Sequence, residues 1–236
     1  MNKTYVCTDI HGMLDKFLDV LKQSKFDYDN DTLINIGDIC DRGSDSFGVV
    51  EELLKIKNLI AIRGNHDWAW LEFIESGFEN HPLPNHGAFE CLESYRNNED
   101  YLVNPCKENL VPKSHLTFYR GQLPYHIDGQ NRLFIHAGLN LEERIEEQTE
   151  DVFCWDRSLI YKAMSCGHND RLNDVNNFKQ IFIGHTPTIN WQKKGKNITK
   201  PIYKGQVVNL DTGACFAGGK MTLIDITTDK HKIYQS

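Results

Sequence analysis

Three apolar runs in the first third of the sequence each end at side chains that could do chemistry. Residues 3–8 are followed by Asp-Ile-His-Gly, residues 32–36 by Gly-Asp-Ile-Cys-Asp-Arg-Gly, and residues 58–62 by Arg-Gly-Asn-His-Asp. Two later apolar runs, 132–138 and 180–186, each contain a histidine close to the end. A turn makes use of glycine or asparagine, but it has no use for these histidines. The candidate donors are Asp9, His11, Asp38, Asn65, His136 and His185.

Carboxylate, imidazole and amide groups together suit Mn²⁺, Fe or Zn²⁺, and they fit neither a thiolate site nor an all-oxygen Ca²⁺ site. A central carboxylate can bridge two cations, and ions roughly 3.5–4 Å apart are a recurrent arrangement for phosphoester hydrolysis. We therefore expect two divalent metal ions as cofactors, with Mn²⁺ favoured and Fe or Zn²⁺ as the alternatives.

Each donor has a plainer interpretation when it is considered alone. Asp41 and Arg42 could form a surface ion pair, and His136 or His185 could be a core histidine with satisfied hydrogen bonds. The combination is harder to explain in that way, because the donors follow one another at the ends of five strand-like runs. The combination favours a metal site.

The elements that must position these donors alternate between strands and helices in the first third of the chain. After each of the first three runs, apolar residues recur at helical spacing, which predicts βαβ units with parallel strands. In an open α/β sheet, the loops at the carboxyl ends of parallel strands share one edge, where ligands bind. Six donors from five strands are thereby expected in one place.

Later strand-like runs lie at 132–138, 180–186, 206–213 and 221–226. They follow one another without long predicted helices, which indicates a second sheet, mixed or antiparallel. The expected fold class is α/β, with two mixed sheets packed as a sandwich between flanking helices. We expect one catalytic domain over 1–236, with an irregular insertion of loops and short helices at about 76–130.

Composition excludes several other classes of function. The chain has 236 residues, and 26 Lys and Arg against 33 Asp and Glu give a net charge of −7. Such an acidic chain is a poor candidate for binding nucleic acid or an anionic membrane. A Lys-rich stretch at 193–204 is best explained as a solvated loop. No segment is apolar enough for a signal peptide or a membrane span, so a cytoplasmic location is expected.

The seven cysteines are odd in number and include no Cys-x-x-Cys pair. This pattern argues against both a disulfide framework and a thiolate zinc site. Cys7, Cys40 and Cys154 stand among apolar residues, where cysteine usually behaves as a small core side chain.

The segments DIHG, GDICDRG, RGNHD, HAG, GHT and LDTGA resemble the signatures of the calcineurin-like metallophosphoesterases. More narrowly, they are similar to the phosphoprotein-phosphatase branch in its bacterial and phage form. The resemblance runs from Asp9 to about Leu223, and the GDxxDRG and GNH pair is its most specific part. Nucleases and many phosphodiesterases of the superfamily carry Gly-His-x-His at the late segment, whereas this chain has Gly184-His185-Thr186-Pro187.

The resemblance implies a role for each candidate residue. Asp9, His11 and Asp38 would hold one ion, and Asp38 would bridge to a second ion held by Asn65, His136 and His185. His66 would be the general acid, oriented by Asp41. Arg42 would bind the phosphoryl oxygens, and so would Arg157 in CWDRSLI, although Trp-Asp-Arg could also be a packed helix start. Asp211 and Thr212 would brace the site.

The implied activity is hydrolysis of phosphomonoesters, chiefly phosphoserine or phosphothreonine in proteins, by direct attack of a metal-bridging hydroxide. Two departures leave an alternative open: the chain has GNHD where protein phosphatases usually have GNHE, and HAGLN lacks a following proline. Symmetrical diadenosine tetraphosphate hydrolases share GNHD and HAG, so a small phosphoester is the alternative substrate. A non-catalytic interaction module is disfavoured, because the ligand set and His66 are complete. The oligomeric state stays open.

Overall fold

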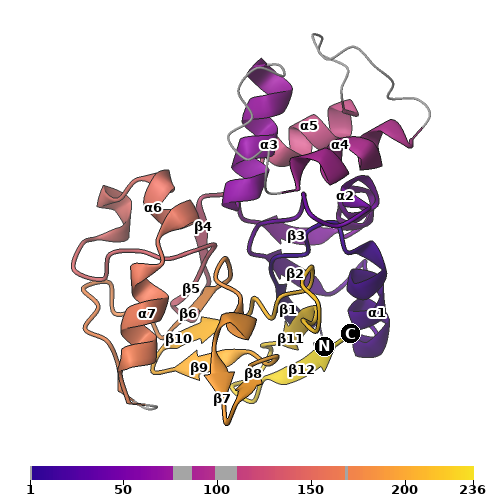
Figure 1. Ribbon diagram of the computed structural model, residues 1–236. Coiled ribbons are helices and arrows are strands. Elements are labelled where there is room, and N and C mark those ends of the chain that lie inside the picture. The colour runs from indigo at the N-terminus through magenta and orange to yellow at the C-terminus, as the bar shows by residue number, and fades with distance from the viewer. Residues whose placement is uncertain (1, 77–86, 99–110, 168–169) are drawn as a thin grey trace.

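The computed structural model describes residues 2–76, 87–98, 111–167 and 170–236 (Figure 1). Its α-helices are α1 Leu14–Ser24, α2 Ser46–Leu54, α3 Asn65–Ser76, α4 Ala88–Arg96, α5 Lys113–Arg120, α6 Glu150–Trp155 and α7 Ser158–Ser165, with 3₁₀ turns η2 Ile145–Glu147 and η3 Thr188–Asn190. Its strands are β1 Thr4–Cys7, β2 Thr32–Asn35, β3 Asn58–Ala61, β4 Tyr125–Ile127, β5 Arg132–Ile135, β6 Gln180–Ile183, β7 Gln192–Lys193, β8 Lys196–Asn197, β9 Ile202–Lys204, β10 Val207–Asn209, β11 Thr222–Asp225 and β12 Lys232–Gln235.

The first sheet has the strand order β12-β11-β1-β2-β3. Strands β1, β2 and β3 run parallel, as the strand–helix alternation predicted. Strand β11 pairs with β1 in antiparallel fashion, with Tyr5 opposite Asp225. The carboxyl ends of β1, β2 and β3 therefore lie at one edge, where their polar loops begin.

The second sheet has the order β4-β5-β6-β10-β9, with β5, β6 and β10 parallel and the outer strands antiparallel. The prediction of a second, mixed sheet is confirmed. The placement of 221–226 among the strands of that sheet was wrong, because this run forms β11 in the first sheet. Two short helices, α6 and α7, stand between β5 and β6, which agrees with the expectation that no long helix would intervene.

Alternating side chains place the two sheets face to face between layers of helices, and Figure 1 shows α1 and α2 beside the first sheet and α7 beside the second. Val6, Ile34 and Ile224 of the first sheet pack against residues of the second in one buried cluster. Phe134 and Phe182 stack within that cluster, with ring centroids 4.9 Å apart. The neighbouring residues along each strand point to the helices instead. Period-two alternation thus produces a four-layer sandwich.

Where the structure describes it, the segment at 76–130 contains helices, connecting loops and one strand. Helices α4 and α5 pack near α2 and α3, and β4 adds an edge strand to the second sheet. The parts at 77–86 and 99–110 lie outside the described residues, as does His168, which matches no motif and for which a surface or structural role is expected. The first part of the Lys-rich stretch forms the exposed β7–β8 hairpin, and Lys204 at its end belongs to β9 of the second sheet. In the part of the chain that is described, no helix is long and apolar enough to cross a membrane.

Candidate metal centre

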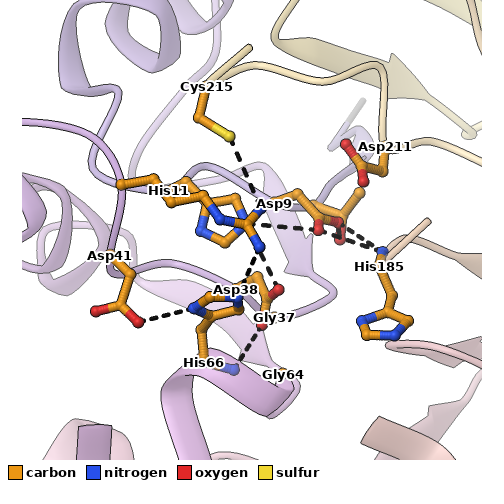
Figure 2. A network of polar contacts seen from close by, with 12 residues as sticks. Asp9, His11, Gly37, Asp38, Asp41, Gly64, His66, His185, Asp211 and Cys215 are labelled. Carbon is orange, nitrogen blue, oxygen red and sulfur yellow. Dashed lines mark hydrogen bonds and ion pairs between the residues drawn. The ribbon is translucent and has the colours of Figure 1, made fainter. Parts of the chain in front are cut away.

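The six candidate donors meet where the two sheets present the carboxyl ends of their parallel strands. Asp9 and His11 follow β1, and Asp38 follows β2. His136 and His185 follow β5 and β6 of the second sheet. Asn65 and His66 form the first turn of α3, which begins earlier than the apolar spacing predicted. Figure 2 shows side chains from both sheets turned toward one another in this region.

Backbone strain is concentrated at these strand ends. Six residues of the region adopt positive φ values although none is glycine: Asp9 (49°), His11 (46°), Asp38 (53°), Asp41 (69°), Arg42 (67°) and His185 (63°). Left-handed conformations are uncommon for side-chain-bearing residues, and they persist where the surrounding structure enforces them. The sharp turns aim successive side chains at one point, which an ordinary extended exit from a strand would not do.

Two glycines permit the close approach of these loops. A Cβ atom on Gly64 would lie 2.2 Å from Oδ1 of Asp38, and one on Gly184 would lie 2.2 Å from Oδ2 of Asp9. Neither contact is physically possible, so the backbone can only come this close to the two carboxylates without a side chain. Gly64 and Gly184 are therefore part of how the site is assembled.

The first group of donors surrounds His11. Its Nδ1 is 2.8 Å from the carbonyl oxygen of Cys40, which fixes the proton on that nitrogen and leaves the Nε2 lone pair to face inward. Nε2 lies 3.6 Å from Oδ2 of Asp38 and 3.9 Å from Oδ1 of Asp9. These separations suit three ligands that share one ion with bonds of about 2.0–2.2 Å.

The second group is built around Asn65. Its Oδ1 lies 3.1 Å from Nε2 of His136 and 2.8 Å from Nδ1 of His185. His136 also approaches Asp38, with Nε2 3.4 Å from Oδ1, while its Nδ1 donates to the carbonyl of Ile36 at 2.8 Å. A hydrogen-bonded Nδ1 is the usual way in which a protein orients a metal-binding imidazole. Asp38 therefore offers one oxygen to each group, as a bridging ligand would.

Burial makes the carboxylates of this region costly to ionise. Desolvation raises the pKa of Asp9, and the charge of Asp38 raises it further. The pKa of Asp211 is likewise raised well above its usual range, first by burial and then by Asp9. Burial also acts upward on the pKa of Asp38, but the charge of His136 and other nearby histidines outweighs it and holds the pKa well below its ordinary value.

The residues present fit a pair of divalent cations. Nδ1 of His185 is the ring nitrogen turned toward Asn65, and its Nε2 is buried without a hydrogen-bond partner among the described residues. Ligand atoms of Asp38, His136 and His185 lie within 4.8 Å of one another, and so do those of Asp38, His11 and His66. Bound cations would neutralise the clustered carboxylates and occupy the inward-facing nitrogens.

His66 sits between Asp41 and Arg42 at the edge of the first group. Its Nδ1 is 2.7 Å from Oδ2 of Asp41, and its Nε2 is 2.8 Å from Nη2 of Arg42. Burial alone would lower the pKa of His66, but the charge of Asp38 and the hydrogen bond to Asp41 outweigh it and raise the pKa. Because both ring nitrogens are engaged in this way, the geometry agrees with an orienting role for Asp41 (Figure 2).

Arg42 also reaches the first group, since its Nη1 lies 2.8 Å from Nε2 of His11. Its guanidinium sits 5.5 Å from the ring centroid of Phe216, a cation–π contact. Arg157 is exposed just before α7, and its positive charge acts on the pKa of His185. Of the two arginines predicted to bind phosphate, Arg42 contacts the first group directly, and a phosphate-binding role for Arg157 stays a prediction.

Asp67 is the residue of the site that the sequence argument did not single out. It is fully buried and accepts hydrogen bonds from the backbone N–H groups of Asp38, Ile39 and Gly64 at 2.9, 2.9 and 3.1 Å. Burial and the charge of Asp38 raise its pKa to about 6. By holding the loop after β2 against the start of α3, Asp67 sets the position of Asp38. The GNHD segment contained this signal in its last residue.

Comparison with known proteins agrees with this geometry. The family model described as calcineurin-like phosphoesterase matches residues 3–194. The chain belongs to this family. Its predicted membership and its two-sheet fold are thereby confirmed, and the metal clusters described above are consistent with the divalent ions that calcineurin-like phosphoesterases use.

Three similar proteins are named for phosphoester chemistry. Serine/threonine-protein phosphatase 1 of Salmonella typhimurium is 24% identical over 225 residues, which cover 94% of this chain and 91% of that protein. Bis(5'-nucleosyl)-tetraphosphatase PrpE [asymmetrical] of Bacillus cereus is 26% identical over 232 residues, which cover 91% of this chain and 86% of that protein. A crystal structure of a protein inferred to be a diadenosine tetraphosphatase aligns with this chain at a TM-score of 0.68 and 19% identity. The alignment covers 100% of this chain and 94% of that one.

The family match and these phosphatase relatives make the chain a hydrolase of phosphoric esters, and the Salmonella relative supports the phosphoprotein-phosphatase branch. The named Bacillus relative is the asymmetrical type, whereas the resemblance of GNHD and HAG implied the symmetrical hydrolases. The relatives thus agree on hydrolysis at phosphorus, but they divide on the substrate and on the bond cleaved, which is a phosphomonoester in a phosphoprotein and a P–O–P anhydride in a dinucleoside tetraphosphate.

Proposed function

We propose that this protein is a metal-dependent phosphatase that removes phosphate from phosphoserine or phosphothreonine in proteins. The observation that carries the proposal is the position of Arg42, which contacts both a candidate metal ligand, His11, and the candidate general acid, His66. One guanidinium thus stands where a phosphoryl group would meet the ions on one side and the proton donor on the other.

The donors Asp9, His11, Asp38, Asn65, His136 and His185 would hold two divalent ions, with Mn²⁺ favoured. When bound, such ions supply Lewis-acid stabilisation and a nucleophilic water at neutral pH. Arg42 and Arg157 would bind the phosphoryl oxygens through charge-assisted hydrogen bonds and stabilise the transition-state charge. Asp211 and Thr212 would support the site without touching substrate, since Asp211 accepts from the N–H of Gly213 and Thr212 bonds to Lys220 and Thr222.

His66 would protonate the departing serine or threonine oxygen. While Nε2 accepts a hydrogen bond from Arg42, the ring is neutral, with its proton on the Nδ1 that faces Asp41. A phosphoryl group that draws Arg42 away frees Nε2 to take up a proton, which it can then give to the leaving group. Since Asp38 would be neutralised by the ions, Asp41 is the partner left to hold the imidazole charged.

Two exposed aromatic rings favour a second candidate, a dinucleoside polyphosphatase. Trp155 is 44% exposed, and its ring centroid lies 6.2 Å from that of His185. Phe216 is 40% exposed and lies over Arg42. Aromatic faces beside a phosphate site can stack a nucleobase, with about 1–3 kcal/mol for each stacked base. A phosphoprotein substrate does not require such rings.

The substrate classes are separated by comparing kcat/KM for a phosphoserine and phosphothreonine peptide panel with that for diadenosine tetraphosphate. We expect the best peptide to exceed the dinucleotide. Trp155→Ala is expected to leave peptide turnover within about twofold, whereas loss of a stacked base would raise KM for the dinucleotide by about 5–150-fold. Phe89→Ala, which removes another exposed aromatic ring, on α4, is the matched control. A dinucleotide preference that depends on Trp155 would replace the phosphoprotein proposal with the second candidate.

Removal of metal is expected to abolish hydrolysis of every substrate. All six proposed ligands are oxygen or nitrogen donors, and the water they would help to activate is a poor nucleophile when no ion is present. Dialysis against a chelator should remove activity, and addition of Mn²⁺ should restore it in proportion to the metal bound. Elemental analysis accompanies each assay. Full activity in protein shown to be free of metal would refute the two-metal site.

A further inference from the structure

A third group of possible metal ligands lies behind the general acid. Ligand atoms of Cys40, Asp41 and Cys91 lie within 4.8 Å of one another, and all three residues are completely buried. Cys40 and Asp41 belong to the loop after β2, whereas Cys91 comes from α4. Cysteine spacing alone pointed away from a thiolate site, because these two cysteines are far apart in the sequence. The packing of α4 brings them together.

Asp41 has an unused oxygen in this region. Its Oδ2 bonds to His66, but Oδ1 is buried without a hydrogen-bond partner among the described residues. A carboxylate oxygen removed from water and left unpaired is costly. The thiol of Cys40 instead lies 3.7 Å from Oδ1 of Asp67, so that hydrogen bond does not relieve Asp41. A cation bound between the two sulfurs and Oδ1 of Asp41 would give this oxygen a partner.

We propose that Cys40, Cys91 and Asp41 form a second, thiophilic metal site that takes Zn²⁺ and inhibits the enzyme when it is filled. Two thiolates and one carboxylate match the ligand preferences of Zn²⁺, for which cysteine sulfur is a common ligand. Mn²⁺ prefers oxygen and nitrogen donors, so it would fill the catalytic centre without filling this site.

Inhibition follows from the position of Asp41, and it rests on the proposed role of His66. A Zn²⁺ ion on Oδ1 would draw the charge of Asp41 away from Nδ1 of His66. The imidazole would then lose the hydrogen-bond partner that fixes its orientation. Catalysis that needs a protonated leaving group would suffer, whereas the ligands of the catalytic ions would be untouched.

Binding exchanges protons for metal without a change of oxidation state. Two thiol protons pass to solvent as two sulfur–zinc bonds form, and the carboxylate of Asp41 binds as the anion. Because Cys91 is completely buried on α4, the ion reaches the sulfurs only when α4 separates from the β2–α2 loop. Onset of inhibition should therefore be slow compared with turnover.

Cobalt substitution tests the site without any substrate. Co²⁺ bound by cysteine gives a sulfur-to-metal charge-transfer absorption, which oxygen and nitrogen ligands do not give. Co²⁺ titration of the chain in the presence of a thiol-free reductant should produce this band, and Cys91→Ala or Cys91→Ser should abolish it. Cys215→Ala is the matched control, since that thiol lies 3.8 Å from Nη1 of Arg42, beside the catalytic centre, and its loss should leave the band. No band, or a band that depends on Cys215 instead, overturns the proposal.

Zinc inhibition is measured on Mn²⁺-loaded protein. Zn²⁺ should slow phosphoserine hydrolysis by about 10²-fold, as loss of general acid catalysis would, and slow p-nitrophenyl phosphate hydrolysis less. Cys91→Ala should keep the Mn²⁺ rate and resist Zn²⁺. Equal inhibition of Cys91→Ala would show that Zn²⁺ acts at the catalytic ions, which refutes the inhibitory role. If no phosphoester is hydrolysed, the proposed function fails, while the cobalt band still reports on the thiol site.

Discussion

Asp38→Asn is expected to abolish most hydrolysis and to lower the metal content of the protein. Changes to groups that merely support metal ligands commonly cost 10–100-fold in affinity or activity, so loss of the proposed bridge should cost more than about 100-fold in kcat/KM. A neutral amide cannot offer an anionic oxygen to each of two cations. In the structure, Oδ2 of Asp38 faces His11 at 3.6 Å, and Oδ1 faces His136 at 3.4 Å.

The measurement combines kcat/KM with metal content per chain after equilibration in Mn²⁺. Asp211→Asn is the matched control, because Asp211 is also a buried carboxylate of this region but accepts from the Gly213 N–H and is not a proposed ligand. It should lose less activity and keep both ions. If Asp38→Asn retained two ions and a near-normal rate, the bridging assignment would be wrong.

Much of this site could be predicted from sequence because its donors obey a local rule. Asp9, Asp38 and His136 each follow an apolar strand directly, and the parallel pairing of such strands forces their carboxyl ends to one edge. The buried positions of Cys7, Cys40 and Cys154 were equally readable from their apolar neighbours, and the structure confirms them.

Features that depend on long-range pairing were not readable in this way. The alternation in Thr222–Asp225 suits either sheet, and only the register with β1 across the whole chain places it in the first. Cys91 stands in a segment with weak periodicity, so its meeting with Cys40 follows from how α4 packs. Asp67 acts through backbone N–H groups of a loop that is remote in sequence, so the GNHD segment marks the residue but only the fold shows which groups it contacts.

His66→Asn is expected to lower kcat/KM on a phosphoserine peptide by about 10²–10⁴-fold, the usual contribution of general acid catalysis. A serine alkoxide is a very poor leaving group, whereas p-nitrophenolate can depart without a proton. The loss on p-nitrophenyl phosphate should therefore be clearly smaller. Metal content should be nearly unchanged, because the backbone N–H of residue 66 still donates to Oδ1 of Asp38, a bond of 3.0 Å that does not involve the imidazole.

Asp41→Asn extends the same test to the partner of the imidazole. It should show the same leaving-group pattern in milder form, because Asp41 acts only through the 2.7 Å hydrogen bond to Nδ1 of His66. Burial lowers the pKa of His66 and the carboxylates around it raise it, so loss of the Asp41 charge should move the basic limb of the kcat/KM profile to lower pH. If Asp41 had only a structural role, Asp41→Asn would lose activity equally on both substrates, and the basic limb of the pH profile would not move. Loss of an ion in His66→Asn would instead make His66 a metal ligand, as its closeness to His11 and Asp38 also permits.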